Sequence, residues 1–188
     1  RRTGSYGVFA RFSRLVADAN RPADDPDFIL QRIEGQILSF NRSVGPAELR
    51  RRIVTYYDPF HNAVDAGIKA NVKKPGDSML LAVHSFTPIW SGRIRTMDIG
   101  VLYNPHESVA VRLATELKKE GFETALNEPY SAKEGLTYSV SRHGTAHNMV
   151  YLELELNQSL VCTAARARKV GRRVADAISR LQIRAEDR

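Results

Sequence analysis

The stretch from Ser78 to Val83, SMLLAV, contains a continuous apolar run and decides the fold of this chain of 188 residues. Such runs are typical of strands that are buried on both faces of a sheet. A second apolar run covers residues 98–103, and residues 122–126 predict a third strand. Residues 150–156, VYLELEL, alternate strictly and predict a fourth. The centre of the chain is therefore expected to form a sheet.

Helical periodicity lies between and around these strands. Residues 107–120 carry an apolar stripe, and Gly121 stands where glycine commonly ends a helix. Residues 46–72 repeat apolar residues at intervals of three and four, which predicts a long amphipathic helix bent at Pro59. A last amphipathic helix is expected over residues 161–181. Strands that alternate with helices through short links indicate an α/β fold, with helices on the faces of a central sheet.

The pattern is weaker near the beginning of the chain. Residues 8–19 predict a short strand or a strand with a turn. A loop rich in proline and aspartate follows, and residues 26–38 are then expected to form a helix.

Composition excludes several classes of protein. The longest apolar runs are far shorter than the ~20 residues of a membrane-spanning helix. The single cysteine, Cys162, cannot form an intramolecular disulfide and fits a reducing cytoplasm. The net charge of +7 permits a nucleic-acid partner. Much of the basic excess lies in residues 166–188, but this segment contains no aromatic residue on which bases could stack. A solvated basic helix face is the favoured interpretation. Phosphate-binding, dinucleotide-binding, zincin and nucleophile-elbow motifs are absent from the sequence.

Polar residues stand near the ends of the predicted strands, where α/β sheets commonly bind ligands. His84 follows the strand 78–83 and could reach a metal or a substrate there, or equally cap a helix or bond a carbonyl. Glu153 and Glu155 point to one face of their strand, since residues two apart do so. A buried carboxylate is costly unless it is paired or functional, but by residue type alone an exposed edge strand is the simpler interpretation.

The other histidines have weaker signals. His143 and His147 are four residues apart and could chelate a metal on a helix, although Gly144 favours a loop at this point. His61 lies in the middle of the long helix and is expected to pack in the protein interior, and His106 is expected at the surface.

Six segments, taken in order, resemble the N-formylglutamate amidohydrolase family. Together they run from Ser13 to Leu160. They are SRLVADANR (13–21), YYDPFH (56–61), HSFTP (84–88), DIGVLY (98–103), NEPY (127–130) and ELNQSL (155–160).

This resemblance implies a metal-dependent amidohydrolase related to zinc carboxypeptidases, with a phosphorylase/hydrolase-like mixed sheet between helices. The substrate would be a small N-formyl or N-acyl amino acid such as N-formylglutamate. The expected cofactor is zinc, which activates water, and the resemblance makes His84 a metal ligand. Glu155 is implied to be the catalytic general base, whereas Glu153 would pair with an arginine or face solvent.

The resemblance also suggests substrate-binding residues. Arg95, or Arg93 in its place, could hold a substrate carboxylate through a bidentate guanidinium contact. Four further residues lie in family motifs that look pocket-lining: Asn20, Arg21, Asn127 and His143.

The chain departs from the family pattern at three points. It has no histidine before His61, so the remaining metal ligands are not identifiable, and residues 1–188 are expected to be a single domain that lacks its N-terminal part. Asn157 and Ser159 replace an arginine and an aspartate, and Asp98 stands where histidine is common. The alternative is therefore a non-catalytic relative that binds an acidic small molecule in the same cleft.

Overall fold

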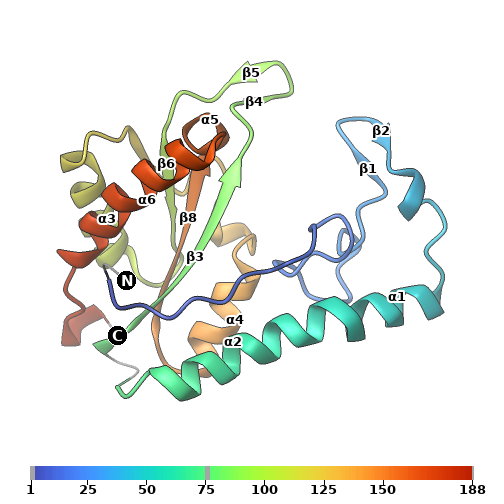
Figure 1. Ribbon diagram of the computed structural model, residues 1–188, viewed down its shortest axis with the longest axis horizontal. Coiled ribbons are helices and arrows are strands. Elements are labelled where there is room, and N and C mark those ends of the chain that lie inside the picture. The colour runs from blue at the N-terminus through green and yellow to red at the C-terminus, as the bar shows by residue number, and fades with distance from the viewer. Residues whose placement is uncertain (1–2, 75–76, 188) are drawn as a thin grey trace. The chain divides into compact units, whose positions relative to one another are not determined.

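The computed structural model describes residues 3–74 and 77–187 (Figure 1). Contacts between Cα atoms divide the chain into two compact units. The larger unit comprises residues 3–5 and 74–187, and the smaller unit comprises residues 6–73. Arg188, at the end of the predicted basic segment, lies outside the described residues.

Within the described residues, the larger unit is built on a mixed four-stranded sheet of order β3-β8-β6-β7. Strand β8 runs parallel to β3 and antiparallel to β6, and β6 runs parallel to β7. The predicted mixed sheet and its four strands are confirmed. They are β3 (Met79–Phe86), β6 (Ile99–Leu102), β7 (Thr124–Leu126) and β8 (Val150–Asn157).

Helices cover both faces of this sheet. Leu152 and Leu154 of β8 join the apolar core formed with α3 (Glu107–Lys119) and α6 (Ala164–Ser179). The opposite face of β8 carries Tyr151, against which α4 (Tyr138–Ala146) packs. The contact is so close that a Cβ atom on Gly144 of α4 would overlap the tyrosine ring. The predicted α/β layers are therefore confirmed.

The larger unit also contains a hairpin and a helix that were not predicted. The first is the hairpin β4 (Ile89–Trp90) and β5 (Arg93–Ile94), whose strands are too short to give a periodic signal. The second is α4, because Gly144 suggested a loop. Glycine is required there by the close packing on the sheet, which sequence alone does not show.

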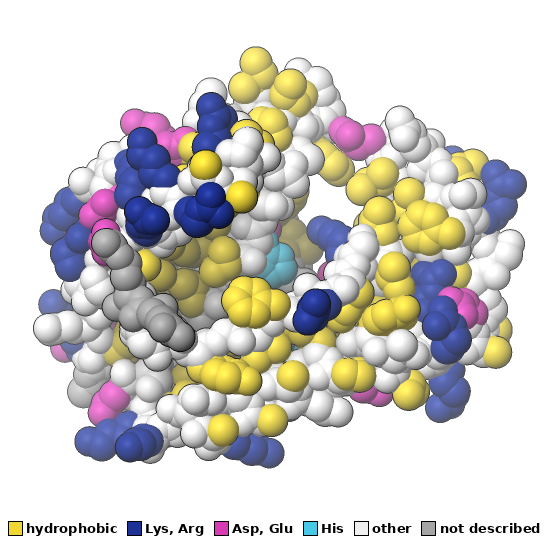
Figure 2. Space-filling view, in the orientation of Figure 1, with side chains coloured by type: hydrophobic (Ala, Val, Ile, Leu, Met, Phe, Trp, Pro, Cys, Tyr) yellow, Lys and Arg dark blue, Asp and Glu magenta, His cyan; other side chains and the backbone are white. Residues whose placement is uncertain are grey.

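The C-terminal helix is divided rather than continuous. A short helix α5 (Gln158–Val161) follows β8 directly, and α6 begins after Thr163. The hydroxyl of Thr163 accepts a hydrogen bond from the Arg166 N–H, which caps the new helix. Figure 2 shows lysine and arginine side chains gathered where α6 lies, as the basic-face interpretation expects. Two short 3-10 helices, η4 (Ala132–Glu134) and η5 (Ala185–Asp187), complete this unit.

The burial of β3 and β8 is the reverse of what their patterns predict. The apolar run in β3 indicated burial on both faces, but β3 lies at the edge of the described sheet and Val83 is 62% exposed. The alternating strand β8 indicated one exposed face, but seven of its eight residues are buried. A central position between β3 and β6, with α4 over the polar face, buries its carboxylates.

The smaller unit contains the predicted long helix. It consists of α1 (Pro46–Arg52), a π-helical turn η2 (Ile53–Tyr57) and α2 (Asp58–Asn71). The widened turn is closed by a bond from the Asp58 N–H to the Ile53 carbonyl, directly before Pro59. Because proline has no N–H to donate, the irregularity lies where the regular pattern would lose a hydrogen bond.

The chain before this helix forms neither the strand 8–19 nor the helix 26–38. It forms turns, a short hairpin of β1 (Arg32–Ile33) and β2 (Gln36–Ile37), and the 3-10 helix η1 (Ser39–Asn41). Glu34 and Gly35 both have positive φ, 45° and 80°, which makes a tight hairpin turn and prevents a helix. Among the described residues, no helix is both long and apolar enough to cross a membrane.

Candidate functional site

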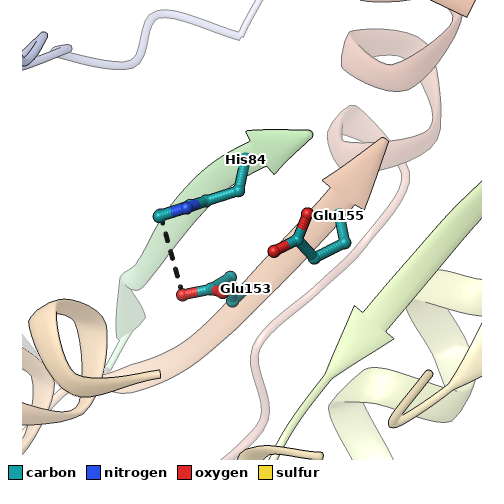
Figure 3. Close-up of side chains that lie close together, drawn as sticks. All are labelled: His84, Glu153 and Glu155. Atoms are coloured by element: carbon teal, nitrogen blue, oxygen red, sulfur yellow. Dashed lines mark ion pairs between the residues drawn. The ribbon is translucent and has the colours of Figure 1, made fainter. Parts of the chain in front are cut away.

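The candidate site lies on the polar face of β8, where three side chains converge. His84 is the register partner of Glu155 in the parallel pair β3 and β8. Glu153 lies two residues before Glu155 and therefore points to the same face. Figure 3 shows the histidine and the two carboxylates directed toward one another. One ligand atom from each residue lies within 4.8 Å of the others.

Burial and pairing correct two expectations about these residues. His84 lies within β3 and not beyond its end, because the strand continues to Phe86. Glu153 does not face solvent: its side chain is 1% exposed, and one carboxylate oxygen lies 3.8 Å from His84 Nε2. Glu155 is also buried, at 6% exposure. Both glutamates are therefore enclosed by protein, which requires compensating contacts for their charges.

The donor set is chemically suited to a divalent cation. Imidazole nitrogen and carboxylate oxygen are the ligand types that zinc takes in proteins besides thiolate. A cation would also compensate two carboxylates that are held close together in a buried place. The half-buried His84, with 35% of its side chain exposed, leaves a route to the cluster from outside.

The loop after β7 reaches the site by passing close to Gly100. Gly100 is the β6 partner of Glu155, on the opposite side of β8 from His84. The Glu128 carbonyl lies so close to Gly100 that a Cβ atom would overlap it. Because paired residues of adjacent strands share a face, the loop after β7 crosses the sheet beside Glu155. Glycine in the segment DIGVLY is thus required by a close backbone approach.

A cleft of about 510 Å³ adjoins this loop, and its lining includes Arg93, Arg95, Glu128 and Pro129. The Arg95 guanidinium carbon lies 5.7, 5.5 and 5.1 Å from three ring centroids, and the guanidinium donates a hydrogen bond of 3.3 Å to a tyrosine hydroxyl. The three rings belong to Phe86, Trp90 and Tyr130. Hydrophobic side chains cover the neighbouring hairpin β4 and β5 at the top of Figure 2.

Sequence analysis singled out the two arginines that line this cleft, but not the aromatic side chains around Arg95. Trp90 and Tyr130 gave no periodic signal because one lies in a two-residue strand and the other in a loop. Glu153 was assigned no catalytic or binding role. Glu153 lies two residues before Glu155 and so shares its strand face. That spacing could have marked Glu153 as a site residue, had the burial of this face been known.

Two other predicted residues occupy different parts of the larger unit. The Asn127 side chain accepts hydrogen bonds from the N–H groups of Tyr103 and Ala132, at 3.0 and 3.3 Å, and so fixes the loop after β7. His143 is 2% exposed within α4. Among the described residues, it is not a member of the group formed by His84 and the two glutamates. The substrate-binding roles of Asn127 and His143 stay predictions.

The remaining two predicted residues, Asn20 and Arg21, belong to the smaller unit. The Arg21 guanidinium is surrounded by carboxylates: its nitrogens lie 3.2 to 3.8 Å from oxygens of Asp18, Asp25 and Asp27. The Asn20 N–H donates to the Asp18 carboxylate. These contacts explain how the segment is held, and a role in substrate binding stays a prediction.

Comparison with known families identifies the class of protein. The profile described as N-formylglutamate amidohydrolase matches residues 1–162, and the chain belongs to that family. It is accordingly a hydrolase that acts on an amide bond. The family predicted from the six sequence segments is confirmed.

Solved structures agree with this fold. A gene product of Agrobacterium tumefaciens is 28% identical, with a TM-score of 0.75 over 90% of this chain and 69% of that chain. An N-formylglutamate amidohydrolase from Ralstonia eutropha is 20% identical, with a TM-score of 0.65 over 90% of this chain and 72% of that chain. The second likeness concerns the fold alone. No curated protein matches the chain significantly.

Proposed function

We propose that this protein hydrolyses a small N-formyl or N-acyl amino acid of the N-formylglutamate kind with the help of a divalent cation, zinc being the expected one. The observation that carries the proposal is the convergence of His84, Glu153 and Glu155 within 4.8 Å in a member of this family. The cleft with Arg93 and Arg95 nearby gives a place for the acidic part of such a substrate.

His84 and Glu153 would hold the cation. Their donor atoms lie 3.8 Å apart, and Glu153 is fixed by its burial in β8. A bound zinc ion would activate water for attack on the amide by making it more acidic. The protein's part is to keep one imidazole and one carboxylate directed at a common point, on two strands whose parallel register fixes them.

Glu155 is the proposed general base. It takes a proton from the attacking water as the new C–O bond forms, and it delivers a proton to the leaving nitrogen as the C–N bond breaks. The products are the free amino acid and the released acid, formate for a formyl group. Its position on β8 beside Gly100 puts the carboxylate next to the loop that lines the cleft.

Arg95 is the proposed partner of the substrate carboxylate. Arg93, which lines the same cleft, is the second candidate for this contact. The aromatic side chains around the Arg95 guanidinium limit its motion and leave it able to form charged hydrogen bonds. The family motifs extend this proposal to four further substrate-binding residues: Asn20, Arg21, Asn127 and His143.

The proposal includes domain organisation and location. The family profile runs through both compact units, which supports a single family domain. The single cysteine, Cys162, supports a reducing compartment such as the cytoplasm.

The test compares three variants of the full-length protein, with zinc content and turnover of N-formylglutamate as separate measurements. Glu155→Gln keeps the shape of the side chain and removes the base, so turnover should fall by about 10²- to 10⁴-fold while zinc content stays near parental. His84→Ala and Glu153→Gln should lose zinc. Glu123→Gln, at an exposed glutamate, is the matched control and should change neither quantity.

Near-parental turnover by Glu155→Gln would contradict the assignment of the base. Unchanged zinc content in His84→Ala would contradict the assignment of the ligand. A zinc-loaded parent protein that binds N-formylglutamate without cleaving it would instead support the non-catalytic alternative.

A further inference from the structure

Asn157, the last residue of β8, uses its whole side-chain amide in hydrogen bonds. The Nδ2 group donates to the backbone carbonyls of Arg95 and Met97, at 3.3 and 3.1 Å. The Oδ1 atom accepts from the N–H and the hydroxyl of Ser159, at 3.1 and 2.8 Å. Asn157 is only 5% exposed. Both N–H bonds of a primary amide are thus directed at one short segment of chain.

That segment, residues 95–97, belongs to neither a helix nor a strand. On one side the Arg95 N–H donates to the Pro88 carbonyl at the base of the hairpin, at 2.8 Å. On the other side the Asn157 side chain donates to two of its carbonyls, and the Asn157 backbone N–H donates to the Asp98 carbonyl at 2.8 Å. The backbone that carries Arg95 is therefore held between the hairpin and the end of β8.

The same contacts connect this segment with the candidate site. Glu153, Glu155 and Asn157 occupy every second position of β8, so their side chains point to the same face of the sheet. Across the parallel pair, Glu155 faces His84 and Asn157 faces Phe86. The Phe86 ring is one of those that surround the Arg95 guanidinium. One row of side chains thus extends from the carboxylates to the arginine.

We propose that Asn157, supported by Ser159, is a positioning residue that fixes the backbone of residues 95–97 so that Arg95 can receive the carboxylate of the substrate. This inference rests on the proposed function of the cleft. Asn157 and Ser159 bond to each other, and the Asn157 amide also bonds the backbone that carries Arg95.

The test uses Asn157→Ser, which is neutral and can still cap α5 but cannot reach the two carbonyls. Loss of the hydrogen bonds should raise KM for N-formylglutamate by about 5- to 30-fold, with kcat changed by less than about 2-fold. KM for the uncharged counterpart, N-formylglutaminamide, should stay near parental. The matched control is Asn104→Ser, at an exposed asparagine that follows β6. Because β6 runs antiparallel to β8, this asparagine lies at the end of the sheet opposite to Asn157.

A double-mutant cycle tests whether Asn157 acts through Arg95. If it does, Asn157→Ser should add little to the KM of Arg95→Ala, because the group that it positions is already gone. Additive effects of the two substitutions, or equal losses on the charged and the uncharged compound, would overturn the proposal.

Binding gives a readout that does not depend on turnover. Trp90 is the only tryptophan of the chain, and its ring centroid lies 5.5 Å from the Arg95 guanidinium carbon. A titration with N-formylglutamate that follows Trp90 fluorescence should show binding weakened by the same factor in Asn157→Ser. Weakened binding without any hydrolysis by the parent protein would support the positioning role and refute the proposed reaction. Parental binding by Asn157→Ser would refute the positioning role, whether or not the parent hydrolyses the compound.

If Asn157→Ser does not fold, Ser159→Ala serves as the second variant. It removes the hydroxyl that bonds Asn157 Oδ1 and should weaken Trp90-detected binding by a smaller factor, about 2- to 5-fold. Unchanged binding in Ser159→Ala would then count against the proposal.

Discussion

The larger and the smaller unit of this chain are stabilised by different kinds of contact. In the larger unit, apolar side chains from β6, β8, α3 and α6 form a core in which Leu113 and Leu154 are fully buried. In the smaller unit, three of the four polar residues that are almost fully buried form hydrogen bonds with the irregular chain before the long helix. They are Asp18, Asn41 and Arg52.

The difference follows from how each unit pairs its backbone groups. A sheet pairs its own N–H and C=O groups, so side chains between its layers can be apolar. The irregular chain of the smaller unit leaves carbonyls that need donors. Asn41 donates to the carbonyls of Leu15 and Leu30, at 2.8 and 2.6 Å, and Arg52 donates to that of Val16, at 3.0 Å. Arg52 also donates to Asn41 Oδ1 at 2.6 Å. Polar side chains there take the place of secondary structure.

The largest effect is expected from a cavity in the apolar core. Leu113→Ala in α3 removes a fully buried side chain and should destabilise the larger unit by about 3–5 kcal/mol, measured by urea unfolding. The control is Val111→Ala on the same helix, where the side chain is 43% exposed and the loss should be much smaller. Equal losses from the two substitutions would mean that the core does not carry the stability of this unit.

A smaller and more local effect is expected from the polar contacts. Asn41→Ala removes the donor to two backbone carbonyls and one of the acceptors of the Arg52 guanidinium, and should destabilise the smaller unit by about 2–3 kcal/mol. Hydrogen exchange should increase within residues 13–42 and stay unchanged in β8, because local opening involves only the contacts that are lost. Asn62→Ala, at an exposed position of α2, is the control. Faster exchange across the whole chain would contradict this separation.

The smallest effect is expected from a polar contact within the larger unit. Asp187 in η5 bonds Arg112 of α3 at 2.6 Å and Ser108 at 2.8 Å, and its side chain is fully buried. The bond from Arg112 lowers the pKa of Asp187 well below its ordinary value. Asp187→Asn should lower the free energy of unfolding by about 1–2 kcal/mol at neutral pH, as expected for a partly exposed charged partner.

The pH dependence of this contact has a definite sign. Because the folded-state pKa of Asp187 is lowered, its contribution is complete above the unfolded-state pKa of about 4 and is lost as the pH falls below that value. The difference between the parent protein and Asp187→Asn should therefore narrow as urea unfolding is repeated from pH 6 down to pH 3. A difference that widens over this range would contradict the assigned contact.

Sequence patterns were more informative for the larger unit than for the smaller unit. In the larger unit, periodicity predicted all four strands of the sheet and α3, because an apolar core imposes a regular spacing on its side chains. In the smaller unit, the same reasoning predicted the helix from residue 46 but assigned a strand and a helix to residues 8–19 and 26–38. That part of the chain is held by single polar contacts, such as those of Asn41, which leave no periodic trace.

The sequence by itself determined the α/β class, the family, and His84 and Glu155 as candidate site residues, since these depend on local periodicity and on short motifs. Only the tertiary structure decided that Glu153 lies beside His84, that the loop over Gly100 passes next to Glu155, and that Asn157 holds the backbone of Arg95. Each of these depends on the register between strands that are distant in the chain. Register is set by packing and backbone hydrogen bonding across the whole sheet, and no single segment encodes it.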